Sequence, residues 1–364
     1  MPFPLFSNAF LPKPRKLRVL VWIAFAVVLG FSCTPEEGLP KQTDLEIPPV
    51  PKGPIRPFHV EGGSLHYQGL PVTYKGVNAM QTFGLVDPGL MNDWKVEIVR
   101  EFIGNLREQP IQGAALQASD GKWYHSLQKI VDQNRAHKRI TIFCPFGWVD
   151  EAGKQTLFTG LNPSTQSFYP AYRGKMQAIA EQFKNQPDVW LEVWNEPYSW
   201  NNQQGYTHAL WLKDMADMVD NLRRVLGFQN IILVPGNEQG QSEAAVIANG
   251  AELLTGRYNL LFDLHAYEKW LQNTSEAQLV TRLQALKKAN FAVVIGEVGV
   301  YNAGNNLDPS AFLAAVKQTD VSVMAWLWNQ DSSYKNALLT NEGLPNATAE
   351  NAYWGKRFQD YLKQ

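Results

Sequence analysis

Residues 123–144 read WYHSLQKIVDQNRAHKRITIFC, and this stretch contains the two kinds of segment from which the fold is built. Four apolar residues recur at spacings i, i+4, i+7 and i+8, which place them on one face of a helix: Trp123, Leu127, Ile130 and Val131. The short apolar run 140–144 that follows is typical of a buried strand. An amphipathic helix that leads into a buried strand predicts a parallel sheet covered by helices.

The same alternation continues on both sides of this stretch, with further helical segments at 206–226 and near 352–362. Another helix has its apolar stripe at Tyr172, Met176, Ile179, Ala180 and Phe183. Eight strand–helix units without spare residues for a second domain predict a single closed (β/α)8 barrel, an α/β fold. No glycine-rich phosphate loop follows an early strand, which disfavours a doubly wound nucleotide-binding sheet. Gly62-Gly63 predicts a hairpin within residues 58–69, before the barrel. The eight predicted strands are Val72–Val77, Glu97–Ile103, Ile140–Cys144, Val189–Val193, Ile231–Val234, Leu260–Leu264, Ala292–Ile295 and Val321–Leu327.

The first 33 residues are interpreted as a signal peptide. Basic residues precede an unbroken apolar run, 19–31, which is shorter than the roughly 20 residues that a membrane-spanning helix needs. The run ends at Ser32-Cys33, which resembles a bacterial lipoprotein signal in which the cysteine is lipidated. An ordinary cleaved signal and an uncleaved anchor are the alternatives, and in each case the protein is expected to leave the cytoplasm.

Residues 34–57 contain seven prolines and few large apolar side chains, so they predict an extended spacer. The folded domain is expected to span residues 58–364, to be monomeric, and to be held by the lipid at a bacterial membrane, in the periplasm or on the cell surface. Without the lipid it would be secreted. Cys144 would then have no disulfide partner and is interpreted as a small buried strand residue.

The composition excludes several classes of protein. The 33 basic and 34 acidic residues leave a net charge of −1, which argues against a nucleic-acid partner, whose binding requires clustered Lys and Arg. Two cysteines and six histidines do not suit a disulfide scaffold or a His-rich metal centre, and no metal or cofactor is expected. Twelve tryptophans in a nearly neutral chain instead suggest a ligand with flat apolar faces, such as a sugar.

Reacting groups of a barrel lie at the C-terminal ends of its strands. Glu196 follows the fourth predicted strand and Glu297 follows the seventh. Either glutamate alone would be interpreted as a solvated loop residue, but a pair across a cleft is what cleavage of a glycosidic bond requires. One carboxyl group must be protonated to donate to the leaving oxygen, and the other must be ionised to attack or to activate water.

Other polar and aromatic residues lie beside the same strand ends. His265 taken alone would be a hydrogen-bonded structural residue, and no HxH or HExxH spacing supports a metal role for it. Four tryptophans at these ends could belong to the core, but their polar neighbours favour sugar stacking for some of them: Trp194, Trp200, Trp270 and Trp328.

Three motifs in order carry a family resemblance. The run Val193-Trp-Asn-Glu-Pro197 resembles the Asn-Glu-Pro signature of glycoside hydrolase clan A, and more closely that of family 5, the cellulase and mannanase family. Lys75-Gly-Val-Asn78 resembles the first strand of that family, and Trp94–Arg100 resembles its second. The resemblance extends over nearly all of residues 58–364.

The resemblance implies a role for each matching residue. Glu196 would be the acid/base, Glu297 the nucleophile, and Asn195 the residue that binds the sugar 2-hydroxyl. Arg100 would support the nucleophile, His265 and Tyr267 would orient the two carboxyl groups, and Trp328 would be the platform under the sugar at subsite −1. The remaining candidates for substrate binding are Asn78, Trp148, Trp200 and Trp270.

One departure concerns substrate choice. The family ends its third strand with a histidine that lines subsite −1, and the matching position here is Phe146. The sequence therefore predicts a retaining, endo-acting β-1,4-glycanase whose partner is a polysaccharide, with β-1,4-glucan ahead of β-mannan. The alternatives are a glycan-binding protein on a hydrolase fold that has lost activity, and a metal-dependent barrel hydrolase, which no cluster of ligands supports.

Overall fold

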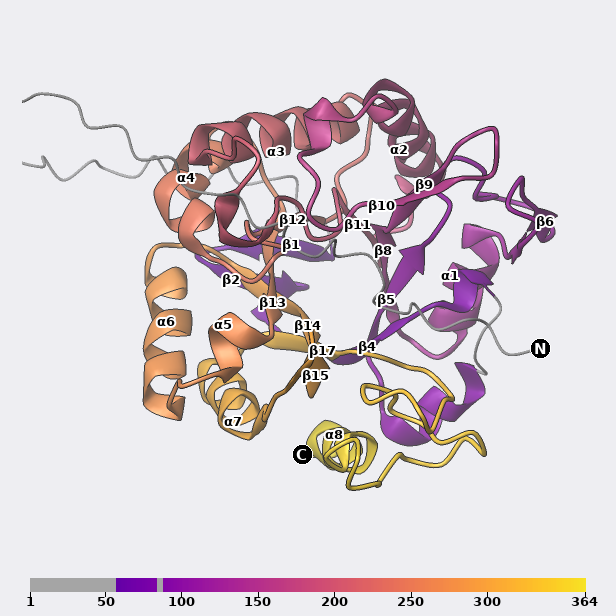
Figure 1. Ribbon diagram of the computed structural model, residues 1–364. Helices are drawn as coiled ribbons and strands as arrows, with labels where there is room; N and C mark the ends of the chain where they lie inside the picture. Colours follow the sequence, from indigo (N-terminus) through magenta and orange to yellow (C-terminus); the bar gives the residue numbers. More distant parts are fainter. Residues whose placement is uncertain (1–56, 84–87) are drawn as a thin grey trace, which may run out of the picture. The chain divides into compact units, whose positions relative to one another are not determined.

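Eight parallel strands close into a barrel in the computed structural model, which describes residues 57–83 and 88–364 (Figure 1). The last barrel strand pairs with the first, with Val323 opposite Lys75, so that no open edge remains. The predicted (β/α)8 fold is confirmed, whereas the predicted signal peptide, the lipidation at Cys33 and the spacer to residue 56 lie outside the described residues. The barrel strands are β4 Lys75–Ala79, β5 Ile98–Ile103, β8 Ile140–Pro145, β11 Val189–Glu192, β12 Ile232–Pro235, β13 Leu260–Ala266, β14 Val293–Val298 and β17 Ser322–Ala325.

Helices surround the barrel, as Figure 1 shows. Their starts are set by capping side chains in several cases: Ser126 and Thr207 each accept a backbone N–H of the first turn, and Ser275 forms a capping box with Gln278. Over the described ranges no helix is long and apolar enough to cross a membrane. The helices are α1 Leu127–Ala136, α2 Tyr169–Phe183, α3 His208–Arg223, α4 Ala244–Leu254, α5 Glu268–Leu271, α6 Glu276–Lys288, α7 Ser310–Thr319 and α8 Trp354–Leu362.

The predicted N-terminal hairpin is present and has a third strand. Strands β1 (Phe58–Glu61), β2 (Ser64–Tyr67) and β3 (Leu70–Pro71) form an antiparallel sheet. Leu65 of this sheet packs with residues at the first positions of the barrel strands, including Ile98 and Ile140. The sheet therefore closes the N-terminal end of the barrel, which leaves the C-terminal end for the loops that carry polar residues.

The core has two layers of different composition. The larger cluster lies between the barrel and the helices and contains the predicted stripe of α2, from Tyr172 to Phe183. The smaller cluster fills the N-terminal part of the barrel interior. Toward the other end, the interior contains fully buried charged side chains instead, among them Arg100, Glu192 and Asp263. Charges inside a barrel are costly unless they are paired, so this end is the candidate site.

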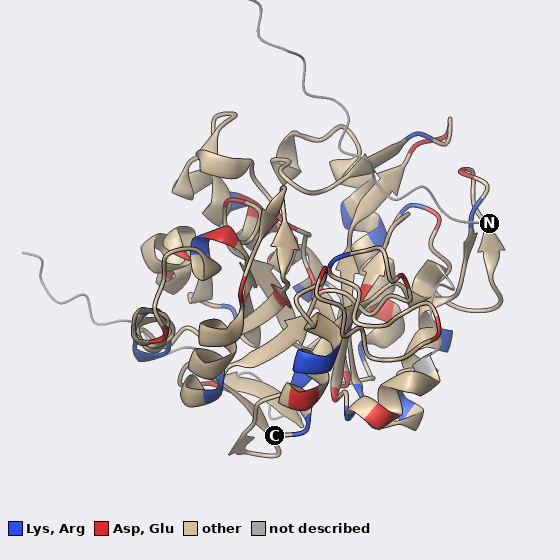
Figure 2. Ribbon diagram, turned by 60° about the horizontal axis from the view of Figure 1, so that its bottom comes forward, with Lys and Arg blue, Asp and Glu red and all other residues tan. Residues whose placement is uncertain are grey.

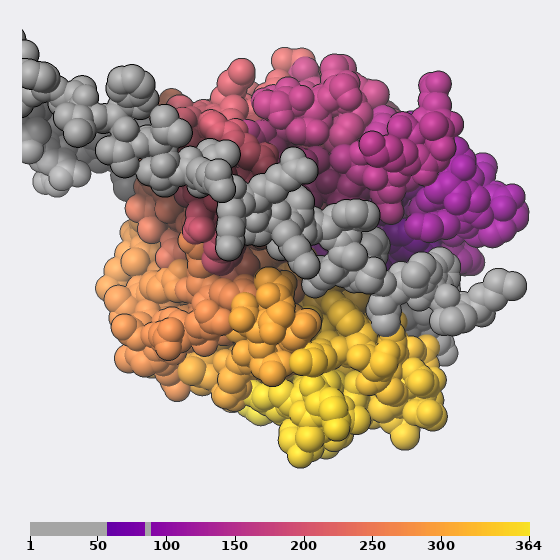
Figure 3. Space-filling view, viewed as in Figure 1, coloured from indigo at the N-terminus to yellow at the C-terminus, as the bar shows by residue number. Residues whose placement is uncertain are grey.

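The loops at the C-terminal ends of the strands contain small hairpins. Strands β6 (Leu116–Gln117) and β7 (Trp123–Tyr124) follow β5, and β9 (Gly147–Val149) and β10 (Gln155–Leu157) follow β8. Trp123 was expected on the buried face of a helix, but it pairs with Gln117 and is 60% exposed. The expectation is wrong because Ser126 caps α1, so that the helix begins only at Leu127. In Figure 3 the segment around residues 110–125 (purple) projects at the right margin of the molecule.

Charged side chains of both signs are interspersed on the described part of the chain. Figure 2 shows Lys and Arg beside Asp and Glu on several of the outer helices. Local pairs occur within single helices, such as Lys356 with Asp360, and between elements, such as Arg257 with Asp220. Exposed pairs of this kind contribute little to stability, so the energetically important charges are those inside the barrel.

Glu101 is a buried carboxyl group next to the site residue Arg100, but on the outer face of β5. Its neighbours are the backbone N–H of Gln81, which donates to Oε2 at 3.1 Å, and the amide side chain of the same residue. Burial outweighs these hydrogen bonds and the charge of Arg139, and raises the pKa of Glu101 to about 8.

This pKa predicts a pH-dependent stability. Between its ordinary pKa of 4.5 and about 8, Glu101 binds a proton in the folded chain that the unfolded chain releases, so its contribution to stability falls as the pH rises through that window. Glu101→Gln cannot ionise, and its Tm should fall less than that of the wild type between pH 5 and 8 in calorimetry. Glu252→Gln, on the exposed face of α4, is the control and should follow the wild type. Parallel curves for Glu101→Gln and the wild type would contradict the assignment.

Candidate active site

Two carboxyl groups converge at the C-terminal end of the barrel. Glu196 lies beyond the end of β11, and Glu297 lies within β14. One oxygen of each, together with a ring nitrogen of His265, lie within 4.8 Å of one another. The His265 Nδ1 atom is 3.0 Å from Glu196 Oε1 and 3.7 Å from Glu297 Oε1. The fold thus brings together three of the predicted residues from three different strands.

Glu297 and His265 belong to strands that extend further than predicted. Strand β14 continues to Val298 and β13 to Ala266, and a bulge shifts their pairing so that His265 lies opposite Glu297. The bulge leaves Gly296 out of the register. Both side chains are therefore held by backbone pairing, which fixes them more firmly than a loop would.

Arg100 occupies the centre of the site and is fully buried. Its Nε and Nη2 atoms donate to the two oxygens of Glu192 at 2.6 and 2.8 Å. Nη1 donates to Glu297 Oε1 at 2.8 Å and to Asn78 Oδ1 at 3.0 Å, and Nη2 also donates to Asn195 Oδ1 at 3.0 Å. Arg100 and Asn78 were grouped with the substrate-binding residues; both are fully buried and hold other side chains, and their contact with a ligand stays a prediction.

Each oxygen of Glu297 accepts one hydrogen bond from the protein. Arg100 donates to Oε1, and the hydroxyl of Tyr267 donates to Oε2 at 2.8 Å. Burial is the largest influence on Glu297 and raises its pKa, and the negative charge of Glu196 acts in the same direction. The charges of His265 and Arg100 and the hydrogen bond from Tyr267 oppose that rise, and the net pKa lies above the ordinary value of 4.5.

Glu196 is the more open of the two glutamates, with 18% of its side chain exposed against 5% for Glu297. Its Oε2 atom accepts from the hydroxyl of Thr159 at 2.9 Å, and that hydroxyl accepts from the amide of Asn195 at 3.2 Å. Glu196 has a φ of 48°, the left-handed region that non-glycine residues rarely occupy, and its carbonyl accepts from Gly160 N at 2.7 Å. Such strain at a functional group indicates that the surrounding structure imposes its orientation. No motif predicted Thr159, because it lies in an irregular loop.

Two of the expected sugar-stacking tryptophans are core residues. Trp194 is fully buried, stacks on Phe158 at 4.1 Å and donates to its carbonyl at 3.1 Å. Trp270 is also fully buried, donates to Gln241 O at 2.9 Å and lies under the Arg282 guanidinium at 3.6 Å. The prediction of sugar contact is therefore wrong for Trp270, because α5 packs its ring inward.

Trp148 and Trp200 differ in exposure. Trp148 in β9 is nearly buried and stacks on Phe168 at 5.4 Å. Trp200 follows Glu196 by four residues and is partly exposed, with the Lys269 Nζ atom 4.9 Å from the centre of its ring. Of these two rings, Trp200 is the more exposed.

The tryptophan at the end of the eighth barrel strand is Trp326, not Trp328. Trp328 is 1% exposed and packs edge-on against Trp94 at 5.1 Å, so it cannot be a platform. Strand β17 ends at Ala325, two residues before the predicted end, which leaves Trp326 partly exposed at the strand end. Its ring N–H donates to the Tyr334 hydroxyl at 2.7 Å.

Phe146 belongs to an apolar wall next to Arg100. It follows β8, is partly exposed, and packs edge-on against Phe102 at 4.9 Å. Trp326 also packs against the Phe102 ring, at 5.1 Å, and the Arg100 guanidinium lies 4.7 Å from the centre of the Phe102 ring. This wall offers contact to the apolar face of a ligand, and the side chain at position 146 offers no hydrogen bond.

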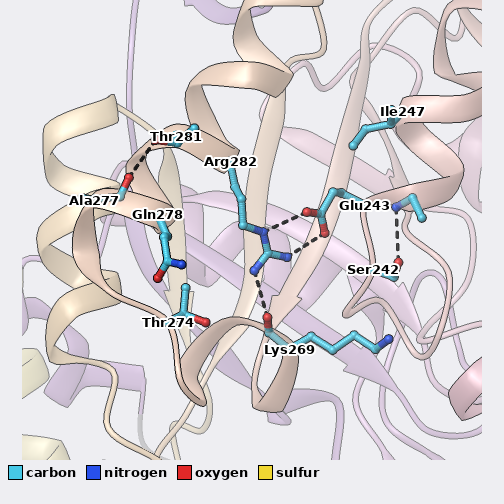
Figure 4. Close-up of a pocket in the computed structure, with 10 residues that line it drawn as sticks. Ser242, Glu243, Ile247, Lys269, Thr274, Ala277, Gln278, Thr281 and Arg282 are labelled. Carbon is cyan, nitrogen blue, oxygen red and sulfur yellow. Dashed lines mark hydrogen bonds and ion pairs between the residues drawn. The ribbon is translucent and has the colours of Figure 1, made fainter.

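A separate recess of about 810 Å³ lies among α4, α5 and α6 and does not contain the glutamate pair (Figure 4). In it, Arg282 donates to both oxygens of Glu243, at 2.9 and 2.8 Å, and to the carbonyl of Lys269 at 2.8 Å. These charged groups satisfy one another, so the recess offers no free acid or base.

Two groups of side chains have the donor set of a metal site, and both share His265. The first adds Glu192 and Asp263, and the second adds Glu196 and Glu297. Arg100 donates hydrogen bonds to a member of each group, so its fixed positive charge already offsets part of their negative charge. A second cation there would be repelled, and the arrangement favours proton transfer over metal binding.

The sequence model described as Cellulase (glycosyl hydrolase family 5) matches residues 88–332. One curated relative, Endoglucanase Z from Dickeya dadantii (strain 3937), is 24% identical over 249 residues, which are 66% of this chain and 50% of the relative. The chain therefore spans about half the length of this relative.

Several solved structures share the fold. The catalytic domain of a mannanase from Streptomyces sp. SirexAA-E superposes with a TM-score of 0.61 and 17% identity, over 84% of this chain and 92% of the other. The catalytic domain of a Thermobifida fusca endoglucanase, in complex with cellotetraose, superposes with a TM-score of 0.60 and 17% identity, over 85% of this chain and 97% of the other. A β-mannanase from Streptomyces thermolilacinus with mannohexaose superposes with a TM-score of 0.60 and 18% identity, over 84% of this chain and 96% of the other.

The hydrogen bonds to Glu297 predict the effect of Tyr267→Phe. Removal of the hydroxyl takes away one of the two donors that stabilise the carboxylate, so the pKa of Glu297 should rise further. Carboxyl carbon chemical shifts of 13C-labelled glutamate, followed by NMR during a pH titration, measure this change. Tyr301→Phe, which removes a hydroxyl elsewhere, is the control. An unchanged or lowered pKa of Glu297 in Tyr267→Phe would show that the hydrogen bond does not stabilise the ionised form.

Proposed function

Because this chain belongs to glycosyl hydrolase family 5, we propose that it is a retaining β-1,4-glycanase that cuts a polysaccharide internally. The observation that carries the proposal is the approach of one Glu196 oxygen to one Glu297 oxygen within 4.8 Å. Retaining glycosidases place their carboxyl groups about 5–5.5 Å apart, whereas inverting enzymes need about 6.5–9.5 Å to fit a water molecule. The spacing supports direct attack by a carboxylate.

In the first step Glu297 attacks the anomeric carbon, and the bond from that carbon to the leaving oxygen breaks. Glu196 gives its proton to the leaving oxygen, so the departing sugar carries a neutral hydroxyl. Arg100 and Tyr267 support the attack because each holds one oxygen of the nucleophile in place. The product of this step is an ester between the sugar and Glu297.

In the second step Glu196, now a carboxylate, removes a proton from water, and the hydroxide attacks the anomeric carbon. The ester bond breaks, Glu297 leaves as a carboxylate and Glu196 is again protonated. His265 and Thr159 contact the two oxygens of Glu196 and so hold its carboxyl group in place during both steps.

Internal cutting is supported by aromatic rings on two different strand ends. Trp200 follows β11 and Trp326 follows β17, and both are partly exposed. Strands β17 and β11 lie four places apart in the closed barrel of eight strands, so the two rings flank the centre from opposite sides. Sugar units on both sides of the scissile bond can then be held.

We propose β-1,4-glucan as the substrate and β-mannan as the second candidate. The glucan is supported by the name of the curated relative and by the Thermobifida fusca endoglucanase with cellotetraose. The mannan is supported by the several mannanases of the same fold, one of which holds mannohexaose. The two sugars differ at the 2-hydroxyl, which is the group that Asn195 is proposed to bind.

We also propose that the enzyme works outside the cytoplasm. The basic residues before the apolar run 19–31 and the residues Ser32-Cys33 support export with a lipid anchor on Cys33. A proline-rich spacer from 34 to 57 would then hold the domain away from the membrane surface.

The proposed activity predicts turnover that depends on Glu297. Release of reducing ends from carboxymethyl-cellulose, glucomannan, galactomannan, xylan and mixed-linkage glucan should show cleavage of a β-1,4-glucan by residues 34–364. Glu297→Gln removes the nucleophile without changing the shape of the side chain, and should lose about a thousandfold or more of that rate. Cleavage of galactomannan alone would identify a mannanase. Glycan binding without cleavage in both proteins would leave a binding protein and overturn the hydrolase.

The two carboxyl roles predict opposite products with azide. With an aryl β-glycoside of the sugar that the enzyme cleaves, Glu297→Gly should be rescued by azide to give the α-glycosyl azide, because azide replaces the nucleophile. Glu196→Ala should give the β-glycosyl azide instead, because the sugar ester forms and azide then replaces water. Proton NMR of the anomeric hydrogen distinguishes the products. A β-azide from Glu297→Gly would show that the roles are assigned the wrong way round.

A further inference from the structure

Asp263 is a fully buried carboxyl group in the site to which the mechanism gives no task. It lies on β13 two residues before His265, so both side chains point to the same side of the strand, into the barrel. Among the described residues neither of its oxygens accepts a hydrogen bond. A Cβ atom at Gly296 would lie 2.2 Å from Asp263 Oδ1, so glycine at this position gives the carboxyl group its room. A buried carboxyl group without hydrogen bonds is costly and requires a reason.

Arg100 has no hydrogen left for this carboxyl group. A guanidinium carries five N–H bonds, one on Nε and two on each terminal nitrogen. The Nε hydrogen goes to Glu192, the two on Nη1 go to Glu297 and Asn78, and the two on Nη2 go to Glu192 and Asn195. Asp263 Oδ2 lies 3.6 Å from Arg100 Nε, which is a contact between charges and not a hydrogen bond.

The His265 ring lies between Arg100, Asp263 and Glu196. Arg100 Nη2 is 3.4 Å from His265 Nε2, a longer contact than its hydrogen bonds to Glu192 and Asn195. Asp263 Oδ2 lies 3.7 Å from Nε2, which is again a contact between charges when the ring is protonated and not a hydrogen bond. The other ring nitrogen, Nδ1, faces Glu196 Oε1 at 3.0 Å.

We propose that Asp263 is a positioning residue whose carboxyl group, facing Nε2, keeps the His265 ring protonated, so that Nδ1 donates a hydrogen bond to Glu196. The inference rests on the proposed function, because it assigns Glu196 the role of acid and base. A carboxylate behind a histidine fixes the ring and stabilises its charged form, as in other acid–base sites.

The reaction explains why a second carboxylate is needed behind His265. In the resting site the ring faces Glu297 as well, whose Oε1 lies 3.7 Å from Nδ1. When Glu297 forms the sugar ester, its negative charge is lost, while Asp263 takes no part in the reaction and still faces Nε2. We expect His265 therefore to keep its proton while Glu196 accepts a proton from water.

All the charged groups that face His265 influence whether its ring is protonated. They come from four strands and the loop after β11: Arg100, Glu192, Glu196, Asp263 and Glu297. Burial by itself would lower the pKa of His265, but the charges of Glu297, Asp263 and Glu196 outweigh burial and raise it well above its ordinary value.

The test observes His265 directly, without any substrate. Long-range 1H–15N NMR of the wild type should show both ring nitrogens of His265 protonated from pH 5 to 8. In Asp263→Asn, which keeps the shape and removes the charge, the ring should lose a proton within this range. Asp217→Asn, which removes a carboxylate outside the barrel, is the control and should leave His265 unchanged. A neutral His265 at pH 6 in the wild type, or an unaltered ring in Asp263→Asn, would overturn the proposal; the wild-type spectrum decides even where the variant fails to fold.

Kinetics separate positioning from a purely structural role. With a dinitrophenyl glycoside of the sugar cleaved, the first step releases the phenolate without acid assistance and the second step limits turnover. Asp263→Asn should keep the initial burst of phenolate, while its steady-state rate falls about tenfold or more. Loss of the burst together with the steady rate would indicate a disrupted site and count against the proposal. If the wild type cleaves no glycan, the proposed function fails, but the NMR test of His265 still stands or falls by itself.

Discussion

The buried guanidinium of Arg100 is the interaction on which the rest of the site depends. It lies inside the barrel with each of its N–H groups paired, and its partners come from β4, β11, the residue before Glu196, and β14. A buried charge is tolerated only when it is paired and fully hydrogen-bonded, so the partners cannot move independently. One side chain on β5 therefore fixes Glu297 directly and reaches Glu196 through Asn195 and Thr159.

The four carboxyl groups around Arg100 differ in their access to solvent. Glu192 and Asp263 lie fully inside, Glu297 is nearly closed off, and Glu196 is the most open. Burial raises the pKa of Glu192 to about 7 despite the charge of Arg100, and it raises that of Glu297 by the same physical effect. The site thus holds more carboxyl groups than cations, and His265 is the group that can take up a proton in response. This explains why one histidine contacts both glutamates.

Much of the fold was predictable because it follows from local patterns. Eight short apolar runs and the helical stripe of α2 were visible in the sequence, and strand bounds missed by up to three residues did not change the topology. The aromatic residues were less predictable. Trp326 and Trp328 are both aromatic and two residues apart, and only the early end of β17 decides which one is exposed. Trp123 had helical spacing with Leu127, but the Ser126 cap placed it in a hairpin.

The sequence by itself determined which residues can do chemistry, because Glu196 and Glu297 follow or end apolar runs whose strands must meet at one end of a barrel. It also determined the family, since the Asn-Glu-Pro motif is local. Only the tertiary structure decided how these residues are held. The donors of Arg100, the bulge at Gly296, the contact of Thr159 with Glu196 and the place of Asp263 behind His265 join positions far apart in the chain. Such contacts depend on the closure of the barrel, and no local pattern records them.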